Sequence, residues 1–100
     1  METRKKILQQ IGRRCALEQL AEELSEASQA ALKLIRAEGL SENVTPVEAQ
    51  AARDALVSEL VDVMMCVQLV EPEHAQRLNG LALCSPKWQR WADRIEQGGR

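Results

Sequence analysis

Apolar residues recur at helical spacing along most of this chain, and this periodicity limits the fold more than any other feature of the sequence. In residues 4–37 the apolar side chains fall on one stripe at about 100° per residue, with one weak point at Gly12. The stripe consists of Leu17, Leu20, Leu24, Ala27, Ala31, Leu34 and Ile35. No stretch shows the strict alternation of a half-buried strand, because Val and Ile lie inside segments with helical spacing. The pattern predicts an all-α fold.

Glycine, proline and capping residues divide the first half of the pattern into two long helices. Gly39 can close the first helix in a left-handed cap. Thr45 followed by Pro46 is typical of an N-cap and a first-turn proline. We therefore expect a second helix from about 46 to 70, which Pro72 ends.

The second half of the chain predicts shorter helices. Residues 71–80 have the pattern of a short third helix closed by Asn79 and Gly80. Ser85 and Pro86 then read as the cap and first residue of a last helix with the sequence KWQRWADRIEQ. The LALC segment between them is too short to assign.

The size of the chain predicts a single domain over residues 1–100, with a helical core at about 4–96. Its only aromatic residues are Trp88 and Trp91, so the core must be built from Leu, Val, Ile, Ala and Met. A small chain without a large aromatic core favours association between subunits, because association buries the apolar surface that one copy leaves exposed.

Charge and cysteine usage exclude several classes of protein. A net charge of -2 gives no electrostatic basis for nucleic-acid binding. No apolar run approaches the roughly 20 residues that span a bilayer, and residues 1–20 lack the features of a signal peptide. We expect a cytoplasmic protein without membrane contact. Its three cysteines lack CxxC spacing, which argues against a disulfide framework or a zinc site.

Two acids in the apolar segment SELVDVMMCVQLV, residues 58–70, need an explanation. Glu59 and Asp62 lie about 60° apart on a helix, and apolar side chains flank them. They could occupy a narrow hydrated face. However, burial of an unpaired carboxylate costs several kcal/mol or more, so a compensating positive charge is the better explanation.

The first helix carries a matching pair of acids. Glu23 and Glu26 have the same spacing of three residues and share a flank with Ala27 and Ala30, where a second helix can approach closely. If the two long helices form an antiparallel hairpin, four carboxylates converge on one spot. Without a cation among them, such carboxylates would raise one another's pKa sharply.

An all-carboxylate cluster suits Mg²⁺ or Mn²⁺. Zinc favours His and Cys, and the single histidine, His74, lies on another segment. A di-iron bundle requires Glu-x-x-His on two helices, and the sequence contains no such motif. The residues themselves therefore predict a magnesium or manganese site.

The acids also resemble a known signature. EELSE at 22–26, followed by ELVD at 59–62, is similar to the EExxE…ExxD motif of the MazG-like, all-α nucleoside triphosphate pyrophosphatases. The segments EELSEASQAALKLIRAEG, NVTPVEAQ and KWQRWADRI resemble other parts of these proteins, and the likeness covers most of residues 15–95. Two features depart from the family: the long gap between the two acidic motifs, and the lack of Phe and Tyr to stack on a base.

The resemblance implies Mg²⁺-dependent hydrolysis of a (d)NTP to the (d)NMP and pyrophosphate. The implied metal ligands are Glu23, Glu26, Glu59 and Asp62, and the implied phosphate-binding residues are Lys87, Arg90 and Arg94. Family members form homodimers or homotetramers, which implies a four-helix-type bundle built by oligomerisation.

The chemistry requires charge neutralisation on the phosphate oxygens and an oriented water. A neighbouring carboxylate could accept the proton of that water, and the candidates are Glu22 and Glu26.

Two other functions fit the same sequence. A non-catalytic helical interaction module would keep the bundle and use the acids for partner contacts, and a related enzyme would hydrolyse another, modified nucleotide. Without the resemblance, the row of basic residues on the last helix, Lys87, Arg90 and Arg94, is typical of a solvated surface. Its two tryptophans are more typical of packing against a neighbouring helix than of stacking on a base.

Overall fold

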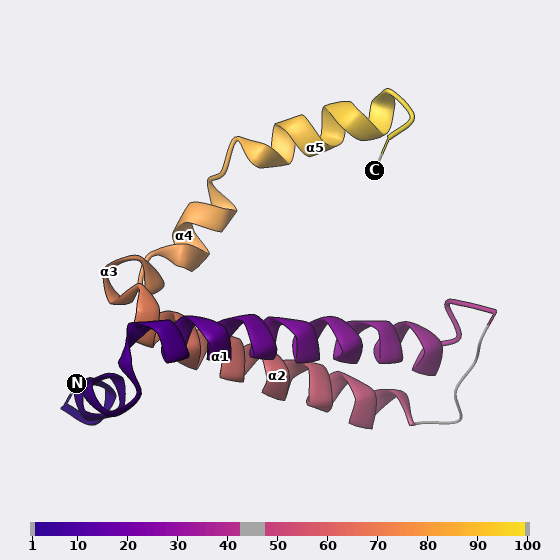
Figure 1. Ribbon diagram of the computed structural model, residues 1–100. Coiled ribbons are helices and arrows are strands. Elements are labelled where there is room, and N and C mark those ends of the chain that lie inside the picture. The colour runs from indigo at the N-terminus through magenta and orange to yellow at the C-terminus, as the bar shows by residue number, and fades with distance from the viewer. Residues whose placement is uncertain (1, 43–47, 100) are drawn as a thin grey trace.

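The computed structural model describes residues 2–42 and 48–99, and all regular structure in these ranges is helical (Figure 1). The helices are α1 (Glu2–Ala37), α2 (Ala49–Val70), α3 (Pro72–Ala75), α4 (Leu78–Leu83) and α5 (Lys87–Glu96). No residue of the described ranges lies in a strand. The all-α prediction is confirmed.

Helices α1 and α2 pack side by side as an antiparallel hairpin, the predicted arrangement (Figure 1). Side chains that are shielded from solvent recur at alternating spacings of three and four residues on both helices, as in a coiled-coil seam. On α1 they are Ala16, Leu20, Glu23, Ala27, Ala30 and Leu34, and on α2 they are Ala52, Leu56, Glu59, Val63, Cys66 and Val70. The most buried of these are small, so the seam is narrow.

This seam is rotated relative to the apolar stripe predicted from the sequence. Leu17, Leu24 and Ile35 belong to that stripe, yet each is exposed, and Leu24 keeps 51% of its surface accessible. The reason is steric, because small side chains on one flank let the helix axes approach more closely than leucines would. The contact therefore forms on the alanine flank, and a row of large apolar residues stays outside the hairpin.

Gly12 bends α1 sharply near its N-terminus. Its backbone angles, φ 81° and ψ 164°, lie in a region that is essentially restricted to glycine. The bend turns residues 2–11 across the end of the hairpin (Figure 1). Arg4 Nη1 donates to Gln68 Oε1 at 2.6 Å, and Arg13 Nη1 donates to the Val70 carbonyl at 2.8 Å. Both arginines thus tie the bent helix to the last turn of α2.

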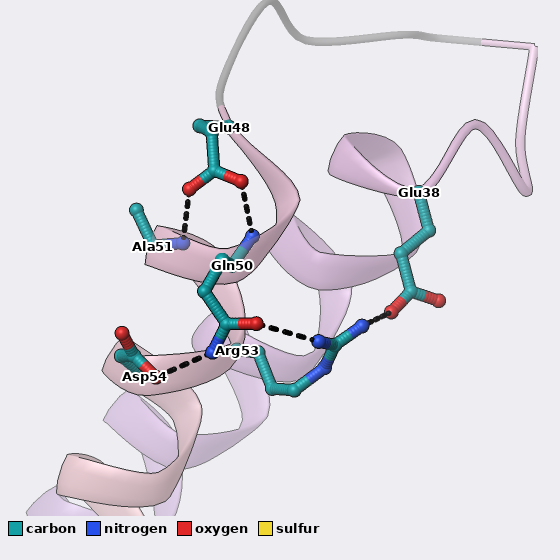
Figure 2. Close-up of polar contacts among 6 residues, drawn as sticks. All are labelled: Glu38, Glu48, Gln50, Ala51, Arg53 and Asp54. Carbon is teal, nitrogen blue, oxygen red and sulfur yellow. Dashed lines mark hydrogen bonds and ion pairs between the residues drawn. The ribbon is translucent and has the colours of Figure 1, made fainter.

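The other end of the hairpin is fixed by helix caps. Gly39 has φ 71° and closes α1 as predicted: its N–H donates to the Arg36 carbonyl, and the Leu40 N–H donates to the Ile35 carbonyl. On α2, the two carboxylate oxygens of Glu48 accept the N–H groups of Gln50 and Ala51, each at 2.9 Å (Figure 2). Both ends of this turn are therefore capped.

The predicted cap of α2 at Thr45 and Pro46 lies outside the described residues. The helix begins at Ala49, three residues later than predicted, because Glu48 supplies the cap. Arg53 Nη2 also reaches back to Glu38 Oε1 at 3.2 Å and joins the two helices near this turn (Figure 2).

The C-terminal residues form an arm rather than a third packed layer. The prediction of one helix closed by Asn79 and Gly80 is wrong, since both residues lie inside α4, and Gly80 does not adopt positive φ. Helix α5 begins at Lys87, one residue later than the predicted start at Pro86, and Ser85 Oγ accepts the Lys87 N–H at 3.1 Å just before it. Figure 1 shows α5 held apart from the hairpin at the end of this arm.

The chain is more extended than its length requires. Its radius of gyration is 17.0 Å, whereas a compact domain of this length has about 13 Å. Large apolar side chains stay exposed on α1, α2, α4 and α5. Among the described residues, no helix is both long enough and apolar enough to cross a membrane.

We predict that Glu48→Ala lowers the free energy of unfolding by about 1 kcal/mol, because it leaves two N–H groups at the start of α2 without acceptors. Urea unfolding followed by circular dichroism, at one fixed protein concentration, measures the change. Glu42→Ala removes an exposed acid that does not cap α2 and serves as the control. Equal stability of the two variants would contradict the capping role.

Candidate metal centre

Three of the predicted metal ligands converge between the two long helices. Glu23 and Glu26 of α1 and Glu59 of α2 each offer a carboxylate oxygen within 4.8 Å of the others. Glu23 and Glu59 occupy seam positions and are partly shielded, whereas Glu26 lies at the edge of the seam and is exposed. The hairpin thus brings acids 33 and 36 residues apart in sequence into one cluster.

Two oxygens of this cluster are buried without a hydrogen-bond partner. They are Oε2 of Glu23 and Oε2 of Glu59, one from each helix. The other oxygen of Glu23 accepts a hydrogen bond from Gln19 Nε2 at 2.8 Å. Buried polar atoms are nearly always paired, and a buried carboxylate oxygen without a partner is costly. These atoms therefore mark a place where a positive charge would lower the energy of the fold.

Local electrostatics agree with this deficit of positive charge. The charge of Glu23 is the largest cause of a raised pKa at Glu26, followed by desolvation, the charge of Glu59, a side-chain hydrogen bond with Glu23 and the charge of Glu22. The pKa of the Cys66 thiol is also raised, first by burial and then by Glu23 and Asp62. The sequence has no Lys or Arg at 15–32 or 54–70, so neither helix neutralises these acids from its own middle.

The donor set fits a small, hard cation. All three side chains offer oxygen, and an all-oxygen carboxylate set suits Mg²⁺ or Mn²⁺ better than zinc. Glu23 and Glu59 would hold the ion with the oxygens that have no partner. Glu26 would complete the set from the exposed edge, where a substrate can approach.

The remaining predicted acids lie near this cluster without joining it. Asp62 follows Glu59 by about one helical turn and is partly shielded, but it is not in the group of three. Its charge instead contributes to the raised pKa of Cys66. Glu22 is exposed, and its charge contributes to the raised pKa of Glu26. Both lie close enough for their charges to act on residues at the centre.

The predicted phosphate-binding residues lie elsewhere in the chain. Lys87, Arg90 and Arg94 are exposed on α5, which stands apart from the hairpin (Figure 1). Within one copy, the structure does not bring them to the carboxylates.

Sequence reasoning missed two neighbours of the centre, Gln19 and Cys66. Gln19 binds the Glu23 carboxylate, and Cys66 is buried in the seam, where the Glu23 charge acts on its pKa. The alternating spacing of three and four through Cys66 and Glu59 on α2, and through Glu23 on α1, could have identified them.

The raised pKa of Glu26 predicts a pH-dependent stability when divalent cations are removed. The folded chain holds the Glu26 proton more tightly than the unfolded chain, whose carboxyl titrates near 4.5. The resulting stabilisation is complete below that pH and is lost as pH rises through the raised folded-state pKa. In EDTA, Glu26→Gln should therefore match the wild type in acid and exceed its melting temperature increasingly towards neutral pH.

Thermal melts of both proteins across this pH range measure the difference. Glu73→Gln changes an exposed acid on α3 and is the control for loss of one negative charge. A constant difference between Glu26→Gln and the wild type at every pH would contradict the electrostatic crowding at the centre.

Comparison with known proteins does not assign a function to this chain. No protein-family model, curated protein or solved structure matches this chain.

Proposed function

We propose that this protein is a Mg²⁺-dependent nucleotide pyrophosphohydrolase that cleaves a (d)NTP to the (d)NMP and pyrophosphate. The observation that carries the proposal is the cluster of Glu23, Glu26 and Glu59, in which two buried oxygens lack any partner. The resemblance of EELSE and ELVD to the MazG-like signature supplies the reaction. The cofactor is Mg²⁺, and Mn²⁺ suits the same ligands.

The four acids divide into two pairs by their surroundings. Glu23 and Glu59 are fixed in the seam, which suits residues that hold a metal ion in one position. Glu26 and Asp62 lie next to them along each helix and would complete the ligand set. When bound, the ion would neutralise charge on the phosphate oxygens and lower the pKa of a bound water.

A carboxylate beside the centre can accept the proton of the attacking water. Glu26 is one candidate, because it lies at the exposed edge of the cluster and is accessible to substrate. Glu22 is the second candidate; it is exposed and lies four residues before Glu26 on α1. Water adds across the α–β phosphoanhydride, and pyrophosphate leaves with the β- and γ-phosphoryl groups.

The basic residues Lys87, Arg90 and Arg94 are proposed to bind the triphosphate. Their separation from the carboxylates within one copy favours an active site shared between copies. The exposed apolar residues and the extended shape of the chain support a homodimer or homotetramer with a bundle of four or more helices.

Pyrophosphate release from a panel of nucleotides tests the proposal. The panel holds the NTPs, the dNTPs and base-modified dNTPs, each with Mg²⁺, with Mn²⁺ and with EDTA. We expect release with at least one nucleotide, only in the presence of a metal ion. Folded protein that releases no pyrophosphate from any nucleotide would favour the non-catalytic interaction module, and release from modified nucleotides alone would favour the related hydrolase.

We predict that Glu59→Gln lowers metal-dependent turnover by about 100-fold or more, because it removes a ligand with an unpaired buried oxygen. Without metal its stability should equal or exceed that of the wild type, since a repulsive charge is lost. Steady-state assays and thermal melts of one preparation measure both effects. Glu73→Gln removes an exposed acid of α3, outside the cluster, and is the control.

We also predict that Asp62→Asn abolishes metal-dependent activity. Its stability without metal should stay level or rise as repulsion between the acids is relieved. The same assays compare it with Glu73→Gln. Full turnover by Asp62→Asn would show that Asp62 is not a metal ligand and would leave the centre with three carboxylates.

A further inference from the structure

Helix α5 carries an apolar face that lacks a packing partner in its own chain. Trp88, Trp91 and Ile95 recur at spacings of three and four residues, and each is about half exposed. The two indole rings stack on each other with centroids 6.0 Å apart. Trp88 Nε1 also donates to the Ala82 carbonyl at 2.6 Å, which ties the face to α4. The arm therefore presents an ordered tryptophan surface to solvent.

The outer side of α2 carries a matching apolar groove. It is shallow and open to solvent, and it is lined by Val57, Leu60, Val61, Met64, Met65 and Gln68. Helical spacing places these residues on the side of α2 that faces away from α1. Their exposure, which reaches 62% at Met65, shows that the groove is uncovered within one copy.

The face of α5 fits within the groove of α2 and matches its chemistry. From Val57 to Gln68 the groove runs about 16.5 Å, and from Trp88 to Ile95 the face runs about 10.5 Å, at 1.5 Å per residue. Methionine side chains adapt to the shape of a partner and make favourable sulfur contacts with aromatic rings. An amphipathic helix lying in an apolar groove is a common mode of recognition.

Charge favours the same pairing. Residues 15–32 contain four acids and no base, and residues 54–70 contain three acids and no base. By helical spacing, Asp54 and Asp62 border the α2 groove. Helix α5 has three basic residues against two acids, and the basic ones flank its apolar face. The acidic hairpin attracts α5 but is repelled by an anionic membrane, which disfavours a lipid surface as the partner.

We propose that the occupant of the α2 groove is α5 from a second copy of this chain. Within one copy, the arm of α3 and α4 holds α5 away from the hairpin (Figure 1). A reciprocal exchange of arms would cover the exposed face and the groove in both copies. Helix α5 can lie along the groove in two orientations. In one of them its basic residues face Asp62 of the other copy. This contact forms whether or not the carboxylates hold a metal ion.

Tryptophan fluorescence reports on this contact directly, because Trp88 and Trp91 are the only aromatic residues of the chain. On dilution, the emission should shift to longer wavelength over the concentration range in which light scattering shows dissociation to single copies. Association without any change in emission would overturn the proposal. So would a blue shift that appears only when anionic vesicles are added, since it would identify a membrane surface as the partner.

Variants in the groove test the contact without altering either tryptophan. Met64→Asp should give red-shifted emission at concentrations where the wild-type emission is blue-shifted, because it places a charge in the groove. Leu40→Asp makes the equivalent change at an exposed site outside the groove and should behave as the wild type. Circular dichroism confirms that each variant is folded. A Met64→Asp spectrum identical to the wild-type spectrum would overturn the proposal.

Cross-linking distinguishes exchange between copies from closure within one copy. Cys15→Ser and Cys84→Ser remove the two exposed thiols and leave the buried Cys66. In this background, a Met65→Cys chain mixed with an Ile95→Cys chain should form a disulfide-linked pair under mild oxidation. If the chain with both changes instead forms only an internal disulfide, and the mixture forms no pair, α5 closes on its own hairpin and the proposal fails.

Discussion

The contact of Glu23 with Glu59 across the α1–α2 seam is the constraint on which the rest of the structure depends. Seam positions normally hold apolar residues, yet two carboxylates face each other here beside Glu26, with an oxygen of each seam glutamate buried and unpaired. The alanines of the seam allow close packing, and close packing intensifies the repulsion. Positive charge at this centre would therefore stabilise the hairpin.

Its polar and apolar surfaces give the hairpin two distinct sides. The acids and the raised pKa of Glu26 lie at one edge of the seam, whereas the large apolar residues of α2 face away from α1. We propose a metal ion at the first surface and a second copy at the second. Asp62 borders both, so charge neutralisation and assembly would meet at that residue.

Much of this arrangement follows from sequence, and the exceptions have physical causes. Helical spacing predicted the hairpin. The paired acids predicted a cluster of four carboxylates, of which Glu23, Glu26 and Glu59 converge and Asp62 does not. The rotation of the seam was not predicted. Hydrophobicity alone places the helix contact on the leucine stripe, whereas close packing of the two helices places it on the alanines. Asn79 and Gly80 are residues that often end helices, and they were therefore predicted to end one. Here both lie inside the short helix α4. The position of α5 could not be predicted, since it depends on contacts beyond the neighbouring residues.

The small side chains of the seam also bear on how this protein responds to concentration. The most buried residues are four alanines, one cysteine and one valine, which contribute little hydrophobic free energy to a single copy. Many large apolar side chains stay exposed in a single copy, and the proposed association would bury part of that surface. Thermal denaturation of such a chain is linked to mass action, and its midpoint should rise with the amount of protein in solution.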